Sequence, residues 1–365
     1  MTSNPISILW MPSVDFDNVN AQSLNTREVA LRLDPALFRS TLFYEREPDQ
    51  RLLNRTNIRL VRLPATFKTF TILREMYSRH ALIAYTDSSP ASYILVHSPG
   101  FIRRGARTAL HVEAPAAQSA DGTRLALLRY KSVAGRCDAH FGITEYVARD
   151  MRSQGLRPNG ILPIGVDTKR FVPPAERRGR IPTVLFAGTV IERKGAHLVV
   201  DVAREVPEAQ FVIVGAARDG FDEVLRKRIQ ERGVTNVRML GPQSQARMVE
   251  IMQESDIFLL PSHLEGIPKV TLEAASTGLP CVVFKTYQTP SVIDGLTGFQ
   301  VANLEEMVSR VSLLTRDAEL RRRMGSEAVR HVQMFDWSIV AAQWQDAYLR
   351  IVEASPVERE SRETV

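Results

Sequence analysis

The sequence predicts an α/β fold built from two doubly wound, Rossmann-like domains. Its 365 residues are too many for one ordinary hydrophobic core and suit two domains of about 100–200 residues each. Short apolar runs alternate with longer amphipathic stretches, which is the pattern of parallel strands joined by helices. Hydrophobic residues make up 44% and charged residues 24% of the chain. That balance is typical of a globular protein and argues against disorder.

The first half, residues 1–172, contains one such series and is expected to form the N-terminal domain. Strands are expected at residues 7–11, 60–63, 94–97, 108–112, 140–143 and 161–164. Helices are expected at residues 25–33, 125–135 and 144–154, the last with Thr144 as its N-cap because a threonine hydroxyl can accept from a first-turn amide.

A proline- and arginine-rich stretch, residues 173–182, has no core periodicity and is the best linker candidate. A second series over residues 183–335 then predicts a compact C-terminal domain. Its strands are expected at 183–187, 210–214, 237–240, 257–260 and 281–284, and its first helices at 196–205, 221–232, 244–254 and 268–277. A last amphipathic helix is expected over 336–353, with a frayed tail over 354–365.

Cysteine usage and the N-terminal residues bear on the cellular compartment. Cys137 and Cys281 are the two cysteines of the chain, so we expect a reducing cytoplasm rather than a disulfide framework or a cysteine metal site. No run approaches the roughly 18 apolar residues of a membrane-spanning helix. Residues 3–14 lack the basic start and long apolar core of an export signal.

Charge is distributed unevenly along the chain. Residues 1–175 contain 23 Lys and Arg against 15 Asp and Glu, a net charge of +8, whereas residues 176–365 contain 24 against 26. A basic first domain favours an anionic membrane surface, an acidic glycan or nucleic acid, and the alternative is a solvated arginine-rich surface. Nucleic acid is not expected as a partner, because no basic module with interleaved aromatic residues occurs.

One stretch of the first domain bears on the membrane hypothesis. Phe67, Phe70, Leu73 and Met76 recur at helical spacing beside Lys68 and Arg74. Such a stripe fits a buried helix face or a lipid-facing one. A peripheral contact with the inner membrane face is therefore a hypothesis at this point.

The segment over residues 257–283 is the richest in chemistry. A buried strand ends at Pro261, a loop carries Glu265 and Gly266, and Pro268 is placed at the start of a helix. This loop lies at the carboxyl end of a strand and beside a helix N-terminus, where open α/β sheets bind phosphate-bearing ligands. Glu265 and Glu273 can then hold two parts of one ligand. Solvent-exposed glutamates are the structural alternative.

Several ordered motifs resemble those of the GT-B-fold retaining glycosyltransferases, glycosyltransferase family 4 or group 1. Glu265 and Glu273, followed by Ala-x-x-x-Gly-Leu-Pro, are similar to that family's signature. Further matching stretches are residues 162–167 with 171–173, 184–188 to 193–195, 211–215, 237–241 and 294–298. The resemblance covers residues 100–345. It implies two domains facing a cleft, an acceptor site in the first domain and a nucleotide diphosphate sugar in the second.

The resemblance also assigns roles to individual residues. Glu265 is expected to hold the donor sugar, Glu273 the ribose, and His111 to face the sugar from the first domain. Lys194, with Arg193, is expected to neutralise the diphosphate. The remaining expected donor contacts are Gly215, Gly241, Pro242, Gln243, Gly266, Ile267, Pro268, Lys269 and Val270. Taken alone, Lys194 also fits a solvated loop lysine, and His111 a structural histidine at a strand end.

The reaction implied is transfer of a hexosyl group with retention, to a glycan, lipid-linked or small-molecule acceptor. No cofactor is expected, and no metal, because the histidines and carboxylates lack ligand spacing and a helix dipole with cations replaces the ion in this family. The last helix is expected to return to the first domain.

Three positions depart from the family pattern. Thr189 stands where an arginine is usual, residues 15–23 lack the usual Gly-Gly turn, and Ile164 replaces an asparagine. The first two concern the grip on the diphosphate. A sugar-nucleotide epimerase of the same architecture and a non-catalytic nucleotide-sugar-binding subunit therefore stay open as alternatives.

Overall fold

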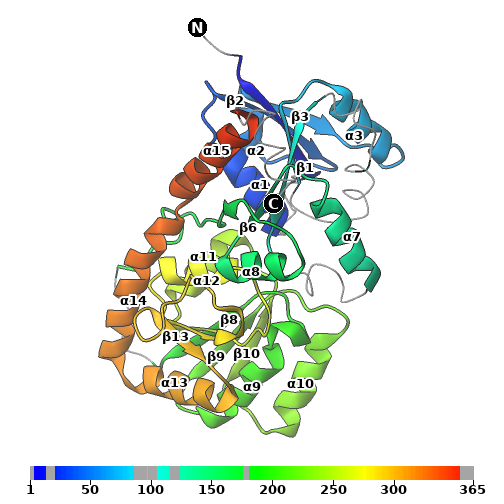
Figure 1. Ribbon diagram of the computed structural model, residues 1–365. Coiled ribbons are helices and arrows are strands. Elements are labelled where there is room, and N and C mark those ends of the chain that lie inside the picture. The colour runs from blue at the N-terminus through cyan, green and yellow to red at the C-terminus, as the bar shows by residue number, and fades with distance from the viewer. Residues whose placement is uncertain are drawn as a thin grey trace. The chain divides into compact units, whose positions relative to one another are not determined.

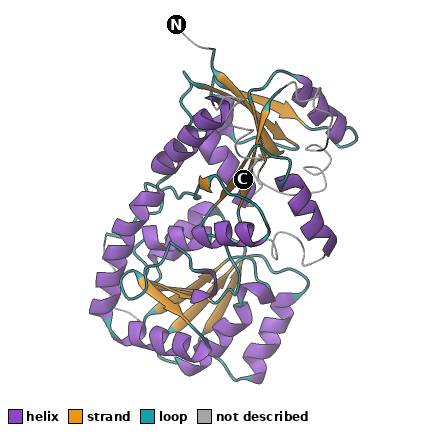
Figure 2. Ribbon diagram, viewed as in Figure 1, coloured by secondary structure: helices purple, strands orange, loops and turns teal. Residues whose placement is uncertain are grey.

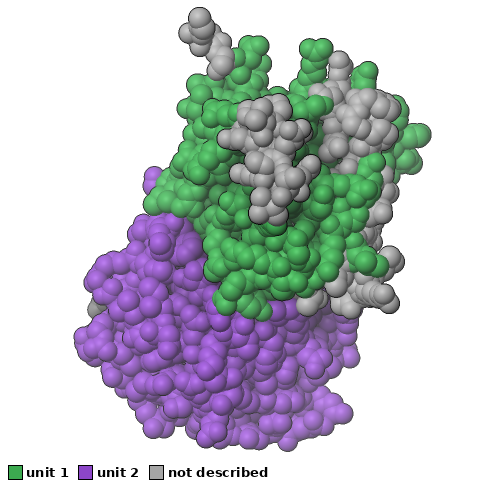
Figure 3. Space-filling view, in the orientation of Figure 1, with its two compact units in different colours: residues 1–164, 337–365 green, residues 165–336 purple. Residues whose placement is uncertain are grey.

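The computed structural model describes residues 4–13, 21–85, 97, 105–115, 124–175 and 181–353. The chain divides into two compact units, one of residues 1–164 with 337–365 and one of residues 165–336 (Figure 3). Each unit contains a parallel sheet with helices packed against it (Figures 1 and 2). The predicted fold class, two Rossmann-like α/β units, is confirmed.

The described residues of the first unit contain a seven-stranded parallel sheet in the order β3-β2-β1-β4-β5-β6-β7. Its strands are β1 (Ile6–Ser13), β2 (Phe38–Tyr44), β3 (Ile58–Arg62), β4 (Leu82–Tyr85), β5 (Arg107–Val112), β6 (Ala139–Gly142) and β7 (Gly160–Ile161). The helices are α1 (Ala21–Ala30), α2 (Gln50–Leu53), α3 (Lys68–Tyr77), α7 (Arg124–Ala134), α8 (Glu145–Ser153) and α15 (Trp337–Glu353). Ile8, Leu9 and Trp10 of β1 are all fully buried, as expected of a parallel strand covered on both faces.

The C-terminal helix α15 belongs to the first unit, although it follows the second in sequence. Trp344 and Tyr348 of α15 are buried, and the Trp344 indole N–H donates to the Pro163 carbonyl at 3.0 Å. The Gln345 side chain accepts from the backbone N–H of Asp34 at 2.9 Å. This helix therefore closes the core of the first unit.

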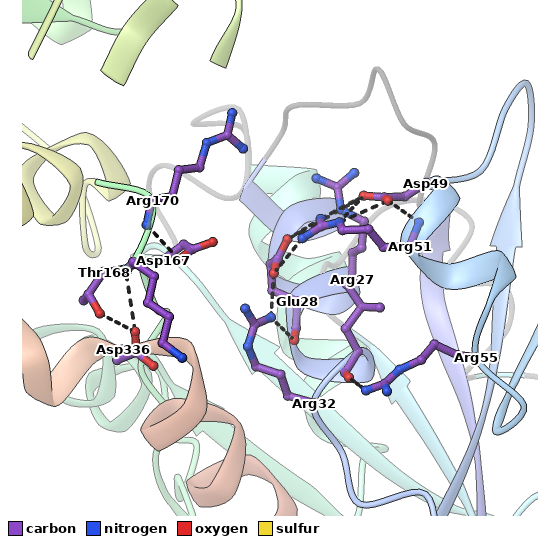
Figure 4. Close-up of polar contacts among 12 residues, drawn as sticks. Arg27, Glu28, Arg32, Asp49, Arg51, Arg55, Asp167, Thr168, Arg170 and Asp336 are labelled. Carbon is purple, nitrogen blue, oxygen red and sulfur yellow. Dashed lines mark hydrogen bonds and ion pairs between the residues drawn. The ribbon is translucent and has the colours of Figure 1, made fainter. Parts of the chain in front are cut away.

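A buried ionic network joins α1 to the start of α2 (Figure 4). Arg51 lies 2.6 Å from Glu28 and 2.8 Å from Asp49, and Arg27 lies 3.2 Å from Asp49. Burial alone would raise the pKa of the Glu28 and Asp49 carboxyls, but Arg51, together with Arg32 at Glu28 and Arg27 at Asp49, outweighs it and lowers both pKa values. Each buried charge of the network thus has a partner of opposite sign, the condition for keeping it inside a protein.

The second unit contains, among its described residues, a six-stranded parallel sheet in the order β10-β9-β8-β11-β12-β13. Its strands are β8 (Thr183–Ala187), β9 (Gln210–Val214), β10 (Val237–Gly241), β11 (Ile257–Leu260), β12 (Cys281–Phe284) and β13 (Gly298–Val301). The α-helices are α9 (Ala196–Glu205), α10 (Phe221–Glu231), α11 (Gln245–Gln253), α12 (Lys269–Ser276), α13 (Leu304–Arg316) and α14 (Ala318–Val332). The short 3₁₀ helices are η1 (Glu192–Lys194), η2 (Lys285–Tyr287) and η3 (Gln333–Phe335).

The boundary between the units differs from the one expected at residue 172, because residues 165–172 belong to the second unit. The Val166 N–H donates to the Phe335 carbonyl at 2.9 Å, and the Thr168 hydroxyl donates to Asp336 at 2.6 Å (Figure 4). These bonds tie together the two ends of the second unit. Proline content indicates a turn-rich stretch but not the hydrogen bonds between residues 166–168 and 335–336. The boundary expected from composition therefore lies eight residues after the observed one.

Local expectations were met where strands and helices are strongly patterned. The Thr144 hydroxyl caps α8 by accepting from the Val147 N–H at 3.0 Å. Pro268 is the N-cap of α12 rather than its first helical residue. Strands β2, β4 and β13 were not predicted, and the strand expected at residues 94–97 lies mostly outside the described residues, as does most of the 15–23 stretch.

Candidate functional site

The candidate site lies at the carboxyl edge of the second unit's sheet. Strand β8 pairs with β9 on one side and with β11 on the other. The chain therefore adds β9 and β10 outward on one side of β8 and adds β11, β12 and β13 outward on the other side. Ligands of doubly wound folds bind outside the carboxyl ends of the strands at this reversal of strand order. The loops that follow β8 and β11 carry Lys194 and Glu265.

Glycine is needed where these loops come closest. Gly195 follows η1 with a φ of +71°, and a Cβ there would lie 2.0 Å from the Pro261 carbonyl oxygen. A Cβ on Gly215, after β9, would lie 1.8 Å from the Gly188 carbonyl oxygen. Any larger residue would push the loops apart, which explains the Lys-Gly and Val-Gly turns of the sequence in physical terms.

The centre of the site is a cluster of charges around Glu265. The ammonium of Lys194 contacts Oε1 of Glu265, and the Ser262 hydroxyl donates to the same oxygen at 2.6 Å. Arg193 lies 3.5 Å from that oxygen and donates to the Leu264 carbonyl at 2.9 Å. The structure thus brings together three predicted site residues, two cations and one carboxylate, on neighbouring loops.

Arg193 bears on the departure at Thr189. Thr189 stands where the family pattern has an arginine, so the place of the Arg193 guanidinium matters. Its side chain remains 39% exposed beside Glu265, so a guanidinium is present at the edge of the site with donors to spare.

The N-terminus of α12 borders this cluster. Pro268 is the N-cap, with no side-chain capping bond, and the helix starts at Lys269. Gly266 and Ile267 are buried in the preceding loop, whereas Lys269 and Val270 are half-buried. The first amides of a helix have no acceptor within it and carry a partial positive charge, so this end of α12 suits a phosphate.

Glu273 lies in the second turn of α12 and is half-buried. Burial raises the pKa of its carboxyl to about 7, against the opposing charges of Lys269 and Arg170. No described side chain or amide hydrogen bonds to this carboxylate. A carboxylate held in this way is ready to accept from the hydroxyls of a ligand.

The remaining predicted contacts lie at the ends of β9 and β10. The Gly215 N–H donates to the Gly241 carbonyl at 2.9 Å, which joins the two strand ends. Gly241 has a φ of +67°, and the Gln243 side-chain amide donates to the Leu240 carbonyl at 2.8 Å. Gly241, Pro242 and Gln243 thus form a defined turn at the same sheet edge as Lys194.

His111 occupies a different environment, inside the core of the first unit. Its ring stacks on Trp344 at a centroid distance of 4.0 Å and on Phe141 at 5.4 Å. Its Nε2 is hydrogen bonded to the Tyr348 hydroxyl at 2.9 Å, and only 1% of the residue is exposed. Burial lowers the pKa of this ring to about 3. This position does not match a residue that faces a sugar, and it fits the structural alternative.

Three residues at the site were not predicted. Ser262 is the second residue after β11, and a polar residue near a strand's carboxyl end was a usable signal. Tyr287 is fully buried, its hydroxyl has no hydrogen-bond partner among the described residues, and burial and Glu265 raise its pKa. Arg170 acts electrostatically on Glu273 and donates to Gln245 at 2.6 Å. Tyr287 and Arg170 are distant in sequence from Glu265 and Glu273, so only folding reveals their proximity.

The described residues contain no group of three or more His, Cys, Asp or Glu side chains placed to hold a metal ion. None of their helices combines the length and apolar character required to cross a membrane.

Comparison with known proteins relates the second unit to a family. The sequence profile of the family described as glycosyl transferases group 1 matches residues 168–331, nearly all of the second unit. The N,N'-diacetylbacillosaminyl-diphospho-undecaprenol alpha-1,3-N-acetylgalactosaminyltransferase of Campylobacter jejuni is 29% identical over 230 residues, covering 58% of this chain and 60% of the relative. The D-inositol 3-phosphate glycosyltransferase of Corynebacterium aurimucosum is 30% identical over 216 residues, covering 52% and 51%. The matches span between half and three fifths of these relatives.

Solved structures match over almost the whole chain. Sucrose-phosphate synthase from Thermosynechococcus elongatus has a TM-score of 0.81 at 17% identity, covering 96% of this chain and all of that one. Anabaena HepE, in complex with UDP and glucose, has a TM-score of 0.78 at 17% identity, covering 94% and 99%. The second unit thus resembles the glycosyl transferases group 1 family, and the chain as a whole has the GT-B fold of these solved structures.

Proposed function

We propose that this protein is a retaining glycosyltransferase that moves a hexosyl group from a nucleotide diphosphate sugar to an acceptor without a metal ion or other cofactor. The observation that carries the proposal is the cluster of Lys194, Arg193 and Glu265 at the switch point, beside the N-terminus of α12. The family match and the names of the relatives support a glycosyltransferase.

The donor diphosphate is assigned to the positive groups of the cluster. Lys194, Arg193 and the first amides of α12, including those of Lys269 and Val270, supply positive charge where the leaving diphosphate gathers negative charge. The ribose is assigned to Glu273, and the base to the turns at Gly215 and Gly241–Gln243. The HepE structure is named for its complex with UDP and glucose, which supports a nucleotide sugar such as a UDP- or GDP-sugar.

Glu265 is assigned to the hydroxyls of the donor sugar. In the reaction, the bond from the anomeric carbon to the diphosphate oxygen breaks, and a bond from that carbon to the acceptor oxygen forms on the same face. The acceptor proton passes to the departing phosphate oxygen. Positive charge develops on the sugar as the diphosphate leaves, so the anion of Glu265 stabilises the transition state more than the ground state. His111 has no part in this proposal.

The acceptor is assigned to the first unit. The Campylobacter jejuni relative is named for a diphospho-undecaprenol acceptor and the Corynebacterium aurimucosum relative for D-inositol 3-phosphate. These names support a lipid-linked or small phosphorylated acceptor, and with it a cytoplasmic enzyme working on substrates at the inner membrane face.

The test is to incubate the purified protein with UDP- and GDP-sugars and pools of glycan, polyprenyl diphosphate and inositol phosphate acceptors, and to follow release of the nucleoside diphosphate. NMR of the product reports the anomeric configuration, which should match that of the donor. Activity that EDTA abolishes and only Mg²⁺ or Mn²⁺ restores contradicts metal independence. Interconversion of the donor without acceptor indicates an epimerase, and donor binding without turnover indicates a non-catalytic subunit.

A further inference from the structure

Helix α3 of the first unit presents aromatic side chains to solvent. Phe67, its N-cap, is 67% exposed, Phe70 is 68% exposed and Tyr77 is 53% exposed. Together with Arg74 they recur at spacings of three and four residues, so they share one helix face. The opposite face buries Thr71, Ile72, Glu75 and Met76. The stripe predicted from the sequence is thus divided, with Met76 in the core and the two phenylalanines outside it.

Basic residues surround this aromatic face. Residues 45–79 contain eight Lys and Arg against four Asp and Glu, a net charge of +4. Two of the four acids are buried, Asp49 at 4% and Glu75 at 2% exposure. Arg46, Arg62, Arg74 and Arg79 are all exposed. The two buried carboxylates pair with arginines of the same stretch, Asp49 with Arg51 and Glu75 with Arg59 and Arg74, so the surface keeps the net charge of +4.

The basic and aromatic residues meet on one surface. Arg62 at the end of β3 and Arg74 of α3 line the same shallow depression, together with Glu45, Leu63, Pro64 and Thr71. Lys68 reaches Glu45 at 2.6 Å, and Arg59 of β3 binds the buried Glu75 of α3 at 2.7 Å. Strand β3 is the edge of the sheet, with α3 beside it in Figure 1. We call this surface the α3 face, comprising Arg62, Phe67, Lys68, Phe70, Arg74 and Tyr77.

Alternative explanations account for only part of this surface. Charged residues on an edge strand prevent strand pairing between molecules, which explains Arg59 and Arg62 but not two exposed phenylalanines. Single-stranded nucleic acid also binds basic surfaces that carry aromatic side chains, but its bases stack within a groove that follows the backbone, whereas Phe67 and Phe70 are exposed on the helix and do not line the depression. Aromatic and basic side chains on one exposed helix face are instead typical of a helix that lies in the headgroup region of a bilayer.

We propose that the α3 face binds an anionic membrane surface. Phe67 and Phe70 enter the boundary between headgroups and acyl chains, Tyr77 lies at the interface, and Arg62 and Arg74 contact lipid phosphates in the depression between β3 and α3. This binding does not depend on the proposed transferase activity, because it uses no residue of the candidate site. It brings the protein to the surface where a lipid-linked acceptor is presented.

Vesicle flotation tests the proposal with the full-length protein. Wild type should float with vesicles of phosphatidylcholine mixed with phosphatidylglycerol, should float far less with phosphatidylcholine alone, and should lose binding as salt rises. Phe67→Ser with Phe70→Ser should weaken partitioning about tenfold for each phenylalanine removed from the interface. Arg62→Gln with Arg74→Gln should weaken it about fivefold for each residue.

Exposed apolar residues of the second unit provide the matched control. Val224 is 51% exposed and Met334 is 54% exposed, so Val224→Ser with Met334→Ser removes similar surface elsewhere and should leave flotation unchanged. The phenylalanine and control variants should keep the wild-type melting temperature, since the replaced side chains are exposed. Arg74→Gln removes one of the two arginines paired with the buried Glu75 and leaves Arg59 at 2.7 Å, so the arginine variant should melt only slightly lower. Equal flotation of the phenylalanine variant and wild type overturns the proposal, as does equal binding to neutral and anionic vesicles. RNA binding that persists in the phenylalanine variant while vesicles fail to bind wild type also overturns it.

Discussion

The ammonium of Lys194 and the carboxylate of Glu265 form an ion pair between the loop after β8 and the loop after β11. The lysine side chain is 17% exposed and the glutamate side chain 8% exposed, so water screens this pair less than an exposed one. Lys194 therefore pairs with the Glu265 carboxylate when no donor is bound. A diphosphate that binds there competes with Glu265 for the lysine, while Arg193 and Ser262 remain beside the carboxylate.

Replacing Lys194 with Gln should weaken donor binding and lower the stability of the donor-free protein. Glu265 would keep Ser262 and Arg193 but lose its closest cation, and removing one partner of a buried pair costs about 3–5 kcal/mol at full burial, with less expected here. Thermal shift with and without a nucleotide sugar measures both effects. If the variant melts lower than wild type but the donor raises its melting temperature as much as it raises that of wild type, Lys194 lies outside the diphosphate site.

Glu265→Gln and Glu273→Gln should fail in different ways. Glu265 is assigned to the sugar that gains positive charge, so its loss should lower kcat about 10²–10³-fold. Glu273 is assigned to the ribose, which changes little in the reaction, so its loss should raise donor KM with kcat nearly kept. Steady-state kinetics at saturating acceptor separate the two. Unchanged kcat with raised donor KM in Glu265→Gln would contradict the sugar assignment.

Donor affinity should rise with pH through neutrality because of Glu273. Burial raises the pKa of this carboxyl to about 7 in the donor-free protein, and only the ionised form accepts from both ribose hydroxyls. Between pH 6 and pH 8 the ionised fraction grows about tenfold, and donor Kd should fall by a similar factor. An intact nucleotide sugar is the right ligand, since its diphosphate does not titrate in this range. Glu273→Gln is the control and should bind the donor independently of pH there.

The same carboxyl should make the second unit less stable at alkaline pH. A pKa of about 7 in the folded protein exceeds the ordinary value, so the stabilising contribution is full below about pH 4.5 and is lost as pH rises through 7. Glu273→Gln should therefore be more stable than wild type at pH 8. Its unfolding free energy relative to wild type should be roughly 2–3 kcal/mol higher at pH 8 than at pH 5. Denaturant unfolding at the two pH values measures this. Equal differences at both would mean that the carboxyl is not buried as described.

The sequence predicted the second unit better than the first. Strands such as β11 are continuous apolar runs bounded by turn residues, and the site loops carry motifs, so the sequence predicted which loops carry Glu265 and Lys194 and, to within one residue, where α12 starts. Strand β4, Leu82–Tyr85, was missed because four apolar residues after His80 give too short a signal. The burial of His111 was missed for another reason. Its partners Trp344 and Tyr348 lie more than 230 residues away in α15, and no local pattern reports that burial.

His111 should act on stability rather than directly on the donor. Burial lowers its pKa to about 3, below the ordinary value of about 6.5, so its contribution is full above pH 6.5 and is lost as pH falls toward 3. At pH 5 this loss is about 2 kcal/mol. His111→Phe keeps a ring to stack on Trp344 and Phe141 but cannot bind the Tyr348 hydroxyl, so it should be less stable than wild type at pH 7. The difference in unfolding free energy between wild type and His111→Phe should be about 2 kcal/mol smaller at pH 5 than at pH 7, because phenylalanine cannot be protonated. Unfolding curves at pH 7 and pH 5 give both numbers, and thermal shift with the donor should match wild type. A variant with wild-type stability at both pH values and a greatly lowered kcat would return His111 to the catalytic role that its sequence motif implied.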